Sequence, residues 1–372
     1  MTGRYEIDLV GRYLAARVEE GWTPGAAWWV EGMGGPVSHG AVGRVTTEAP
    51  QARLSEATPF DLASLTKPLS TALLLVLLER DGLLDLSRPV SDFLGRMDGS
   101  AFASASLLEL ATHRSGLVAW RPLYLRASGA DGYVSQIAEE SPAVPPGETL
   151  YSDLGYILLG QVIEQATGRG LRPLFRELVS APLRLERIDY AADRREFSDA
   201  AATERGNAYE RAMAGATGDD HPWRTHVLQG EVHDANAHGL GGVAGHAGLF
   251  GTAGEVAAIV REMVRPSELG LDDACRRRLL QPTAGSKGRS VGMVTAAFSR
   301  AARRILPDEA PGHTGFTGTS LWIDPRGRRF YVLLTNRVHP VIGRREFNMV
   351  RRGFHRAALR AVEGASTDLP LQ

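Results

Sequence analysis

The order of sequence patterns along this 372-residue chain predicts an α/β (α+β) fold, an antiparallel sheet flanked by N- and C-terminal helices with an inserted, mostly helical lobe. Strand-like segments lie near both ends of the chain, helical patterns fill the middle, and a helical pattern stands at each extreme. Strands from the two ends are therefore expected to pair in one sheet, with a cleft between the lobes. The expected unit is a single domain over 5–362, with an α/β lobe at about 1–66 and 245–365 and a helical lobe at about 67–244.

The N-terminal part predicts an amphipathic helix followed by a hairpin. Apolar residues recur at helical spacing from Ile7 to Val18. Segments 25–32 and 37–45 are typical of short strands and are joined by a Gly-Gly-Pro turn. A second helical pattern runs from 64 to about 81, where an Asp-Gly pair gives a C-cap signal.

The middle and the end of the chain supply the remaining elements. Further helices are expected at 87–94, 104–113, 131–139, 154–167, 171–179 and 254–264. The Gly-, Ala-, Asp- and His-rich region 190–245 predicts mostly loop. Strands are expected at 291–298, 318–324 and 329–336, with a final helix over about 344–363.

Composition excludes several classes of function. A formal net charge of −1 without a basic stripe argues against nucleic-acid binding, which needs clustered Lys and Arg. The most apolar stretch, 69–78, is too short to span a bilayer. The N-terminus lacks the apolar core of a signal peptide, so a cytoplasmic location is expected. Cys275 is the only cysteine, which excludes an intramolecular disulfide and a thiolate metal cluster.

The first chemical element is Ser64-Leu-Thr-Lys67, at the start of the helical pattern 64–81. Only two of the 42 basic residues are lysines, Lys67 and Lys287. Arginine stays protonated in proteins, whereas a partly buried lysine can lose its proton and act as a base. On a helix, Ser64 and Lys67 project from one face, which places a hydroxyl beside an amine and favours a serine nucleophile. The alternative is a surface lysine in the first helical turn.

Two other short motifs carry polar groups next to predicted elements. In LYSDLGYILLG, Tyr151 and Asp153 precede an apolar helix, and a phenol there can relay protons. The alternatives are a packed aromatic for Tyr151 and an N-cap for Asp153. His313-Thr314-Gly315 precedes a strand whose edge can bind a substrate through backbone groups, and the glycine permits close approach. The alternative is a simple turn before the strand.

The segment 230–253 is dense in glycine and histidine. Dense glycine indicates close backbone packing, and histidines beside an aspartate suggest a metal site. The candidate ligands are His233, Asp234, His238 and His246. Since no helical His-x-x-x-His spacing occurs, satisfied structural histidines are the alternative.

Taken in order, these motifs resemble those of a known superfamily. Ser64-x-x-Lys67, LLELATHRSGL (107–117), YSDLGYILLGQVIEQATG (151–168) and His313-Thr314-Gly315 are similar to motifs of the serine β-lactamase and penicillin-binding-protein-like superfamily. The resemblance extends over roughly 5–362 and is to the branch of class C β-lactamases, D-Ala-D-Ala carboxypeptidases and family VIII esterases. It implies the β-lactamase/transpeptidase-like fold.

The resemblance also implies a mechanism. Ser64 would attack a carbonyl and form an acyl-enzyme, Lys67 would accept its proton, and Tyr151 would pass a proton to the leaving group. The Ser64 N–H and a second backbone N–H would form an oxyanion hole. The implied substrate-binding residues are Asp153, His313, Thr314, Gly315 and Thr317, with the Thr317 N–H as the second donor. The implied substrate is a small molecule or short peptide with an ester, amide or lactam carbonyl, and no metal or organic cofactor is implied.

Two residues depart from the pattern of that superfamily. Asp153 stands where asparagine is usual, and a carboxylate near Lys67 favours the ammonium form of the amine. His313 stands where lysine is usual, and imidazole is mostly neutral near pH 7. The weaker cation argues against efficient β-lactam hydrolysis and favours ester, amide or peptide bonds.

Three hypotheses follow. The first is a serine hydrolase of this superfamily acting through Ser64, Lys67 and Tyr151. The second is a binding or sensor module on the same fold that is acylated slowly or not at all, which Asp153 keeps open. The third is a metal-dependent hydrolase built on His233, Asp234, His238 and His246.

Overall fold

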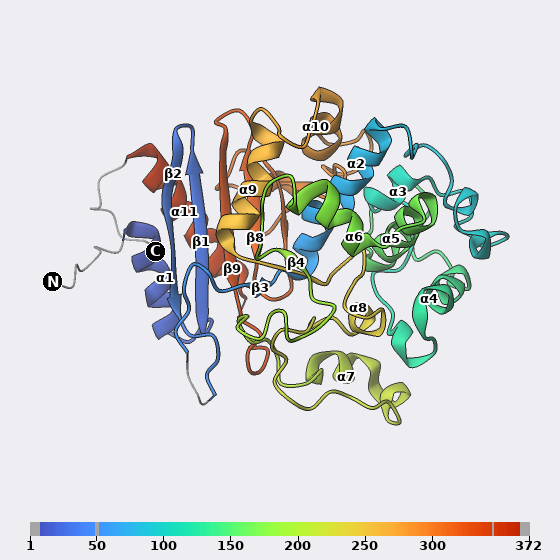
Figure 1. Ribbon diagram of the computed structural model, residues 1–372, viewed down its shortest axis with the longest axis horizontal. Coiled ribbons are helices and arrows are strands. Elements are labelled where there is room, and N and C mark those ends of the chain that lie inside the picture. The colour runs from blue at the N-terminus through green and yellow to red at the C-terminus, as the bar shows by residue number, and fades with distance from the viewer. Residues whose placement is uncertain (1–7, 49–51, 344–345, 365–372) are drawn as a thin grey trace.

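The computed structural model describes residues 8–48, 52–343 and 346–364. An antiparallel sheet of six strands runs in the order β2-β1-β9-β8-β7-β6, so the N-terminal hairpin pairs directly with the last strand of the chain (Figure 1). Its strands are β1 (Gly25–Gly32), β2 (Gly35–Gly43), β6 (Val294–Thr295), β7 (Pro311–Thr314), β8 (Ser320–Asp324) and β9 (Arg329–Thr335). The expected pairing between the two ends of the chain is confirmed.

Helices cover both faces of the sheet and bury most residues of its central strands, β1, β8 and β9. The helices α1 (Leu9–Glu19) and α11 (Asn348–Glu363) pack together on one face, and α9 (Ala253–Val264) packs on the other (Figure 1). Strand alternation assigns neighbouring residues to different cores: Trp28 packs with the α1 and α11 side, and Ala27 packs with the α9 side.

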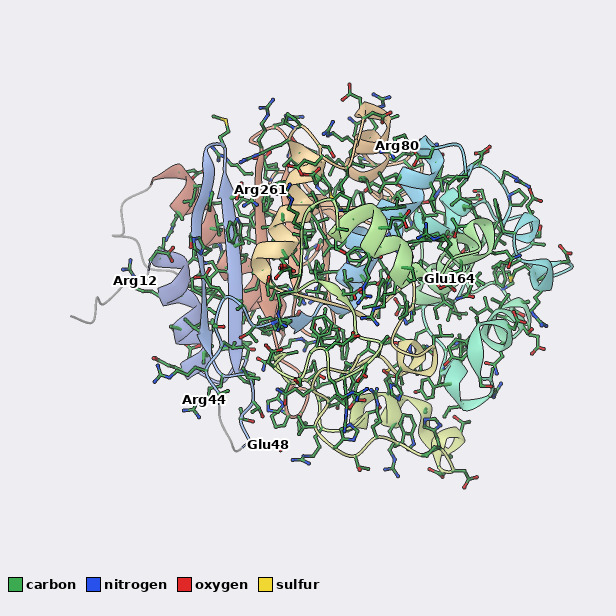
Figure 2. All side chains as sticks on the ribbon, viewed as in Figure 1. Arg12, Arg44, Glu48, Arg80, Glu164 and Arg261 are labelled. Carbon is green, nitrogen blue, oxygen red and sulfur yellow. The ribbon has the colours of Figure 1, made fainter. Side chains whose placement is uncertain are left out.

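A buried carboxylate joins the sheet to α9. Glu31 on β1 is fully buried, and it accepts hydrogen bonds from Arg261 at 2.8 and 3.0 Å; Arg261 is labelled on α9 in Figure 2. Arg265 also lies 2.9 Å from Glu31. Because the charge is paired from two sides, burying it on the sheet is tolerated.

The rest of the chain forms a mostly helical lobe beside α9 (Figure 1). Its helices are α2 (Ala72–Arg80), α3 (Leu107–Ala111), α4 (Gly129–Ala138), α5 (Asp153–Thr167), α6 (Leu171–Phe175), α7 (Ala208–Ala214), α8 (Ala235–Gly239) and, toward the sheet, α10 (Asp273–Leu280). A three-stranded sheet in the order β3-β5-β4 lies between the two parts, with strands β3 (Phe60–Asp61), β4 (Asp189–Tyr190) and β5 (Leu249–Gly251). The α/β (α+β) architecture with an inserted helical lobe is confirmed.

Several predicted element bounds were wrong. The segment 87–94 forms only a short 3₁₀ turn at Val90–Asp92, since Pro89 is extended and disfavours helix in the residue before it. The strand expected at 291–298 is shortened to β6, because Gly292 has a φ of +89° and a 3₁₀ turn follows β6. The region 190–245 contains α7 and α8, which its Gly-rich composition concealed.

The helical pattern at 64–81 is broken into three pieces. A 3₁₀ turn covers Ala63–Leu65, a π-type turn covers Lys67–Thr71, and α2 follows. Irregular turns of this kind are frequent where a helix carries functional groups. No helix among the described residues is long and apolar enough to cross a membrane.

Candidate active site

Ser64 is held at a strained corner between β3 and α2. The preceding residue, Ala63, has a φ of +47°, which is rare for a residue with a Cβ. The Ala63 N–H donates to the Asp61 carboxylate at 2.8 Å, and this bond holds the corner. Backbone strain of this kind tends to occur at functional sites, where the surrounding structure enforces it.

Lys67 is fully buried one turn after Ser64. Its Nζ lies 3.0 Å from Ser64 Oγ, 3.0 Å from the His246 carbonyl oxygen and 2.7 Å from Asp153 Oδ1. Burial by itself would lower the pKa of Lys67, but the charges of Asp153 and Tyr151 outweigh burial and raise it. Three acceptors surround the Lys67 amine, and the raised pKa favours its ammonium form.

Tyr151 faces Ser64 from the segment that immediately precedes α5. Its hydroxyl donates to Ser64 Oγ at 3.0 Å, and burial, followed by the charge of Asp153, raises its pKa. The ring of His113 packs against the Tyr151 ring at 4.5 Å between centroids. His113 Nδ1 accepts the Ser152 N–H at 3.0 Å, and burial holds the pKa of His113 well below its ordinary value. A neutral His113 thus positions the loop that carries Tyr151.

Asp153 is not the N-cap of α5. The Ser152 hydroxyl oxygen caps that helix by accepting the Gly155 N–H, so the alternative interpretation of Asp153 was wrong. The Asp153 carboxylate, which is 19% exposed, pairs instead with Lys67. The structure therefore brings Ser64, Lys67, Tyr151 and Asp153 together.

The residues His313, Thr314 and Gly315 run along the edge of β7 beside the same serine. All three line a cavity of about 500 Å³ together with Ser64 and Tyr151. A Cβ on Gly315 would lie 2.8 Å from the Leu62 carbonyl oxygen and 2.0 Å from the Thr319 hydroxyl oxygen. The glycine is therefore required because β7 packs directly against the loop that carries Ser64.

His313 cannot replace a lysine as a permanent cation. It is 5% exposed, and burial, with the charges of Lys67 and Arg289, holds its pKa well below the ordinary value. Its Nδ1 lies 2.9 Å from the Thr314 carbonyl oxygen, which fixes the Nδ1–H tautomer of a neutral ring.

Thr317 and Phe316 differ in what they face. Thr317 is buried, and its hydroxyl donates to the Asp61 carbonyl oxygen at 2.8 Å. Phe316 lines the 500 Å³ cavity and also a second cavity of about 200 Å³, and Ser64 lines both. Phe316, rather than Thr317, borders the space next to the serine.

Sequence reasoning missed one cation of the site, Arg289. Its guanidinium lies 5.5 Å from the centroid of the Tyr151 ring and lines the 500 Å³ cavity. Among the described residues, no side-chain hydrogen bond or ion pair involves this guanidinium. Nothing in the sequence distinguishes Arg289 from the other arginines.

Three other arginines line the 500 Å³ cavity, and each has partners. Arg351 donates to the Gly315 carbonyl oxygen at 2.7 Å, and Arg337 donates to that of Phe316 at 3.0 Å. Arg300 pairs with Glu346. Arg289 is the member of this set that is left to bind a ligand.

The four candidate metal ligands of the segment 230–253 do not converge. His233 pairs with Glu204 and His246 pairs with Asp234, each at 2.9 Å, while His238 is exposed. Within residues 8–48, 52–343 and 346–364, no three His, Cys, Asp or Glu side chains form a group that could hold a metal ion. The metal-site interpretation was wrong; the segment instead supplies the His246 carbonyl that holds Lys67.

The dense glycine of that segment has a packing reason. A Cβ on Gly245 would lie 2.0 Å from the Tyr156 carbonyl oxygen on α5. Next to it, the Gly245 carbonyl accepts the Thr71 hydroxyl at 2.7 Å. The segment is therefore held directly between α5 and the turn that contains Lys67.

Comparisons with known proteins give matches over most of the chain. The family model described as Beta-lactamase matches residues 10–351. The N-acetylmuramyl-L-alanine amidase of Bacillus subtilis (strain 168) is 32% identical over 318 residues, 78% of this chain and 71% of that protein. A putative D-alanyl-D-alanine carboxypeptidase of Escherichia coli (strain K12) is 27% identical over 322 residues, 80% of this chain and 73% of that protein.

A solved structure confirms the expected fold. The beta-lactamase from Sulfitobacter sp. EE-36 matches with a TM-score of 0.72 over 97% of this chain and 98% of that chain, at 19% sequence identity. At that identity the similarity concerns the fold alone, and it agrees with the β-lactamase/transpeptidase-like architecture expected from the motifs.

Proposed function

Since the chain belongs to the beta-lactamase family and is a serine hydrolase of that family, we propose that it cleaves amide or peptide bonds through an acyl-enzyme on Ser64. The observation that carries the proposal is the position of Ser64 Oγ, 3.0 Å from both Lys67 Nζ and the Tyr151 hydroxyl. A nucleophile needs a route by which its proton can leave and a proton donor for the leaving group, and the Lys67–Asp153 pair and Tyr151 are positioned for these two tasks.

The resting ion pair determines how the serine loses its proton. Lys67 is an ammonium, so it can accept the Ser64 proton only as it passes one of its own to Asp153 along the 2.7 Å contact. Ser64 Oγ then bonds to the substrate carbonyl carbon. As the C–N bond breaks, Tyr151 gives its proton to the leaving nitrogen and recovers one from the Lys67–Asp153 pair. Water then attacks the ester carbonyl, and Ser64 regains its proton.

The negative oxygen of the intermediate needs two donors. We propose the Ser64 N–H and the Phe316 N–H, which replaces the Thr317 N–H expected from the motif. Support comes from the lining of the site: Phe316 borders the cavities that meet at Ser64, and Thr317 is buried against the Asp61 carbonyl. One such donor is typically worth about 3–4 kcal/mol of transition-state stabilisation.

The charge of the site selects which leaving groups are accepted. Arg289 stands over the ring of Tyr151, the group that protonates the leaving nitrogen, and His313 is neutral. We propose that Arg289 binds a carboxylate on the leaving group, the task that lysine has in the related motif. The segment His313–Gly315 then positions the substrate, because it forms the edge along which the substrate backbone lies.

The substrate class follows from these features and from the relatives. The matched amidase and putative carboxypeptidase are named for cleavage of amide bonds. A short peptide or N-acyl amino acid with a free carboxylate fits the Arg289 side. Esters with activated leaving groups are expected to be hydrolysed with lower specificity, and β-lactams are expected to be poor substrates.

The test is covalent labelling followed by turnover. A fluorophosphonate probe should label Ser64 in the full chain, and Ser64→Ala should lose both labelling and hydrolysis of short peptides and esters. Labelling at another residue, or unchanged hydrolysis by Ser64→Ala, would refute the proposal.

The Lys67–Asp153 ion pair also favours a second candidate, a slowly acylated binding module. An ammonium that is paired is a poor base, and a stalled acyl adduct would then be the product. Linear product release over many turnovers without a stable adduct on Ser64, as seen by intact-protein mass spectrometry, would exclude this candidate.

A further inference from the structure

The 200 Å³ cavity beside Ser64 has an acidic lining. It shares only Ser64, Asp153 and Phe316 with the arginine-lined cavity. One basic side chain lines it, His233, and that ring is already paired with Glu204. The carboxylates that line it are Asp61, Asp153, Glu210 and Asp234.

Three of these carboxylates are occupied by partners within the chain. Asp153 pairs with Lys67 and Asp234 pairs with His246. Asp61 accepts two backbone N–H groups, those of Ala63 and His233, at 2.8 Å each. These groups form the fixed frame of the cavity.

Glu210, on α7, differs from these three because one of its buried oxygens has neither a hydrogen bond nor an ion pair among the described residues. It is 5% exposed, and its Oε1 accepts the Ala235 N–H at 3.0 Å. Its Oε2 has no hydrogen-bond partner in the part of the chain that the structure describes. The Tyr124 hydroxyl is near enough to lower the pKa of Glu210 but likewise lacks a hydrogen bond of good geometry. A buried carboxylate oxygen without a donor is costly unless a ligand supplies one.

The electrostatics of Glu210 favour a cationic ligand over a neutral one. Burial, followed by repulsion from Asp234, raises its pKa to about 7. A bound cation would reverse that penalty by pairing with the ionised form. Three of the residues at the cavity are aromatic, and aromatic faces attract organic cations; they are Trp120, Tyr209 and Phe316.

We propose that this acidic cavity binds a primary ammonium group close to the scissile carbonyl, so that the preferred substrate is an α-amino acyl amide or short peptide with a free N-terminus. The inference rests on the proposed function of Ser64. The acyl part, with its ammonium, lies toward Glu210, and the leaving amine, with its carboxylate, lies toward Arg289. The nucleophile stands between two subsites of opposite charge.

Matched substrates test the proposal on the full chain. We compare alanyl, N-acetylalanyl and lactoyl p-nitroanilides, with both enantiomers of each, by kcat/KM. The free amine should be preferred by at least about tenfold over both neutral analogues, the size expected from one buried charged hydrogen bond. Glu210→Gln should reduce that preference at least about tenfold, mainly through KM. Glu268→Gln, an exposed glutamate outside both cavities, should leave it unchanged.

The outcomes separate the two proposals. Equal or better turnover of the acetylated or lactoyl substrate, with Ser64 still labelled by the fluorophosphonate, would overturn the ammonium subsite and leave the hydrolase proposal standing. Failure of Ser64 to label would overturn both. If circular dichroism shows that Glu210→Gln is unfolded, the wild-type substrate preference still decides the question.

Discussion

The two cavities that meet at Ser64 have opposite charge. The 500 Å³ cavity is lined by four arginines and one carboxylate, Asp153. The 200 Å³ cavity is lined by four carboxylates and one histidine. Ser64, the proposed nucleophile, and Asp153, the partner of Lys67, line both cavities. The arginines line only the first cavity, and the other three carboxylates line only the second. The proposed catalytic groups thus lie where the cavities join, and each cavity is proposed to select a different part of the substrate.

Two buried histidines near the arginine-lined cavity and one buried glutamate in the acidic cavity respond to pH in opposite directions. On the arginine side, His113 and His313 are held neutral, with pKa values well below the ordinary 6.5. On the acidic side, burial and Asp234 raise the pKa of Glu210 from the ordinary 4.5 to about 7. The first pair resists becoming charged on acidification, and the second group resists becoming charged as pH rises.

The largest expected effect is a loss of activity toward all substrates when a catalytic group at the junction of the two cavities is removed. Lys67→Ala should lower kcat/KM by about a thousandfold or more for amine-bearing and neutral substrates alike, because the proton route from Ser64 to Asp153 is lost. Lys287→Ala is the matched control, since Lys287 is the only other lysine and is exposed. A Lys67→Ala enzyme that is folded by circular dichroism and retains a tenth of wild-type kcat/KM would contradict this role.

Next in size is an effect confined to the arginine side. Arg289→Gln should raise KM by about 10- to 100-fold for substrates whose leaving group carries a carboxylate, because a charged hydrogen bond is lost. The same substrates with the carboxylate amidated should be affected much less. Arg326→Gln, at an exposed position outside both cavities, serves as the control. Equal losses on the acid and the amide would mean that Arg289 only supports the ring of Tyr151.

A smaller effect is a shift of the pH profile rather than a loss. In Asp153→Asn the carboxylate that accepts the Lys67 proton is removed, so only the neutral form of Lys67 can take the Ser64 proton. The acid limb of kcat/KM should therefore move to higher pH by about one unit or more. An unmoved acid limb would show that the Lys67–Asp153 pair does not control the proton transfer.

The smallest expected effects are on stability and have opposite sign on the two sides. The unfolded chain protonates His113 below about pH 6.5 while the folded chain does not, so the free energy of unfolding falls as pH drops from 6.5 toward the folded pKa. The slope is about 1.4 kcal/mol per pH unit for one such histidine. Glu210 acts in the other direction. Its contribution to the free energy of unfolding is fully present below pH 4.5 and is lost as the pH rises through about 7.

Urea unfolding at pH 7 and pH 5 measures this contrast. His113→Asn, which keeps an acceptor for the Ser152 N–H, should make the loss of stability on acidification shallower than in the wild type. Glu210→Gln, which lies near Asp234, His233 and Tyr124, should make it steeper. If the free energy of unfolding depended on pH in the same way in both variants, the proposed electrostatic difference between the cavities would be contradicted.

The sequence predicted elements well where a strong local pattern dominated. The apolar helix at 154–167 and the strands at 25–32 and 329–336 matched α5, β1 and β9 within two residues. Prediction failed where a proline or glycine interrupted the pattern, as at 87–94. It also failed for β3, β4 and β5, which are two or three residues long and exist because of pairing between distant segments.

The same division holds for the candidate site. Ser64 and Lys67 were paired from sequence because a three-residue separation on a helix has a fixed geometry. Arg289 and Glu210 were missed because their meaning depends on burial and on which groups lie nearby, and those are set by segments far apart in the chain. The four residues proposed as metal ligands were close in sequence, but in the fold His246 pairs with Asp234, His233 pairs with Glu204 and His238 is exposed, so they share no common point.

By itself, the sequence determined the order of secondary structure, the serine and lysine one turn apart, and the family motifs, since each of these depends on neighbours within a few residues. Only the tertiary structure decided that Asp153 lies 2.7 Å from Lys67, that Phe316 borders the serine, and that Ser64 stands between an arginine-lined and a carboxylate-lined cavity. The physical reason is that burial and Coulomb interactions depend on distance in space, which folding alone establishes.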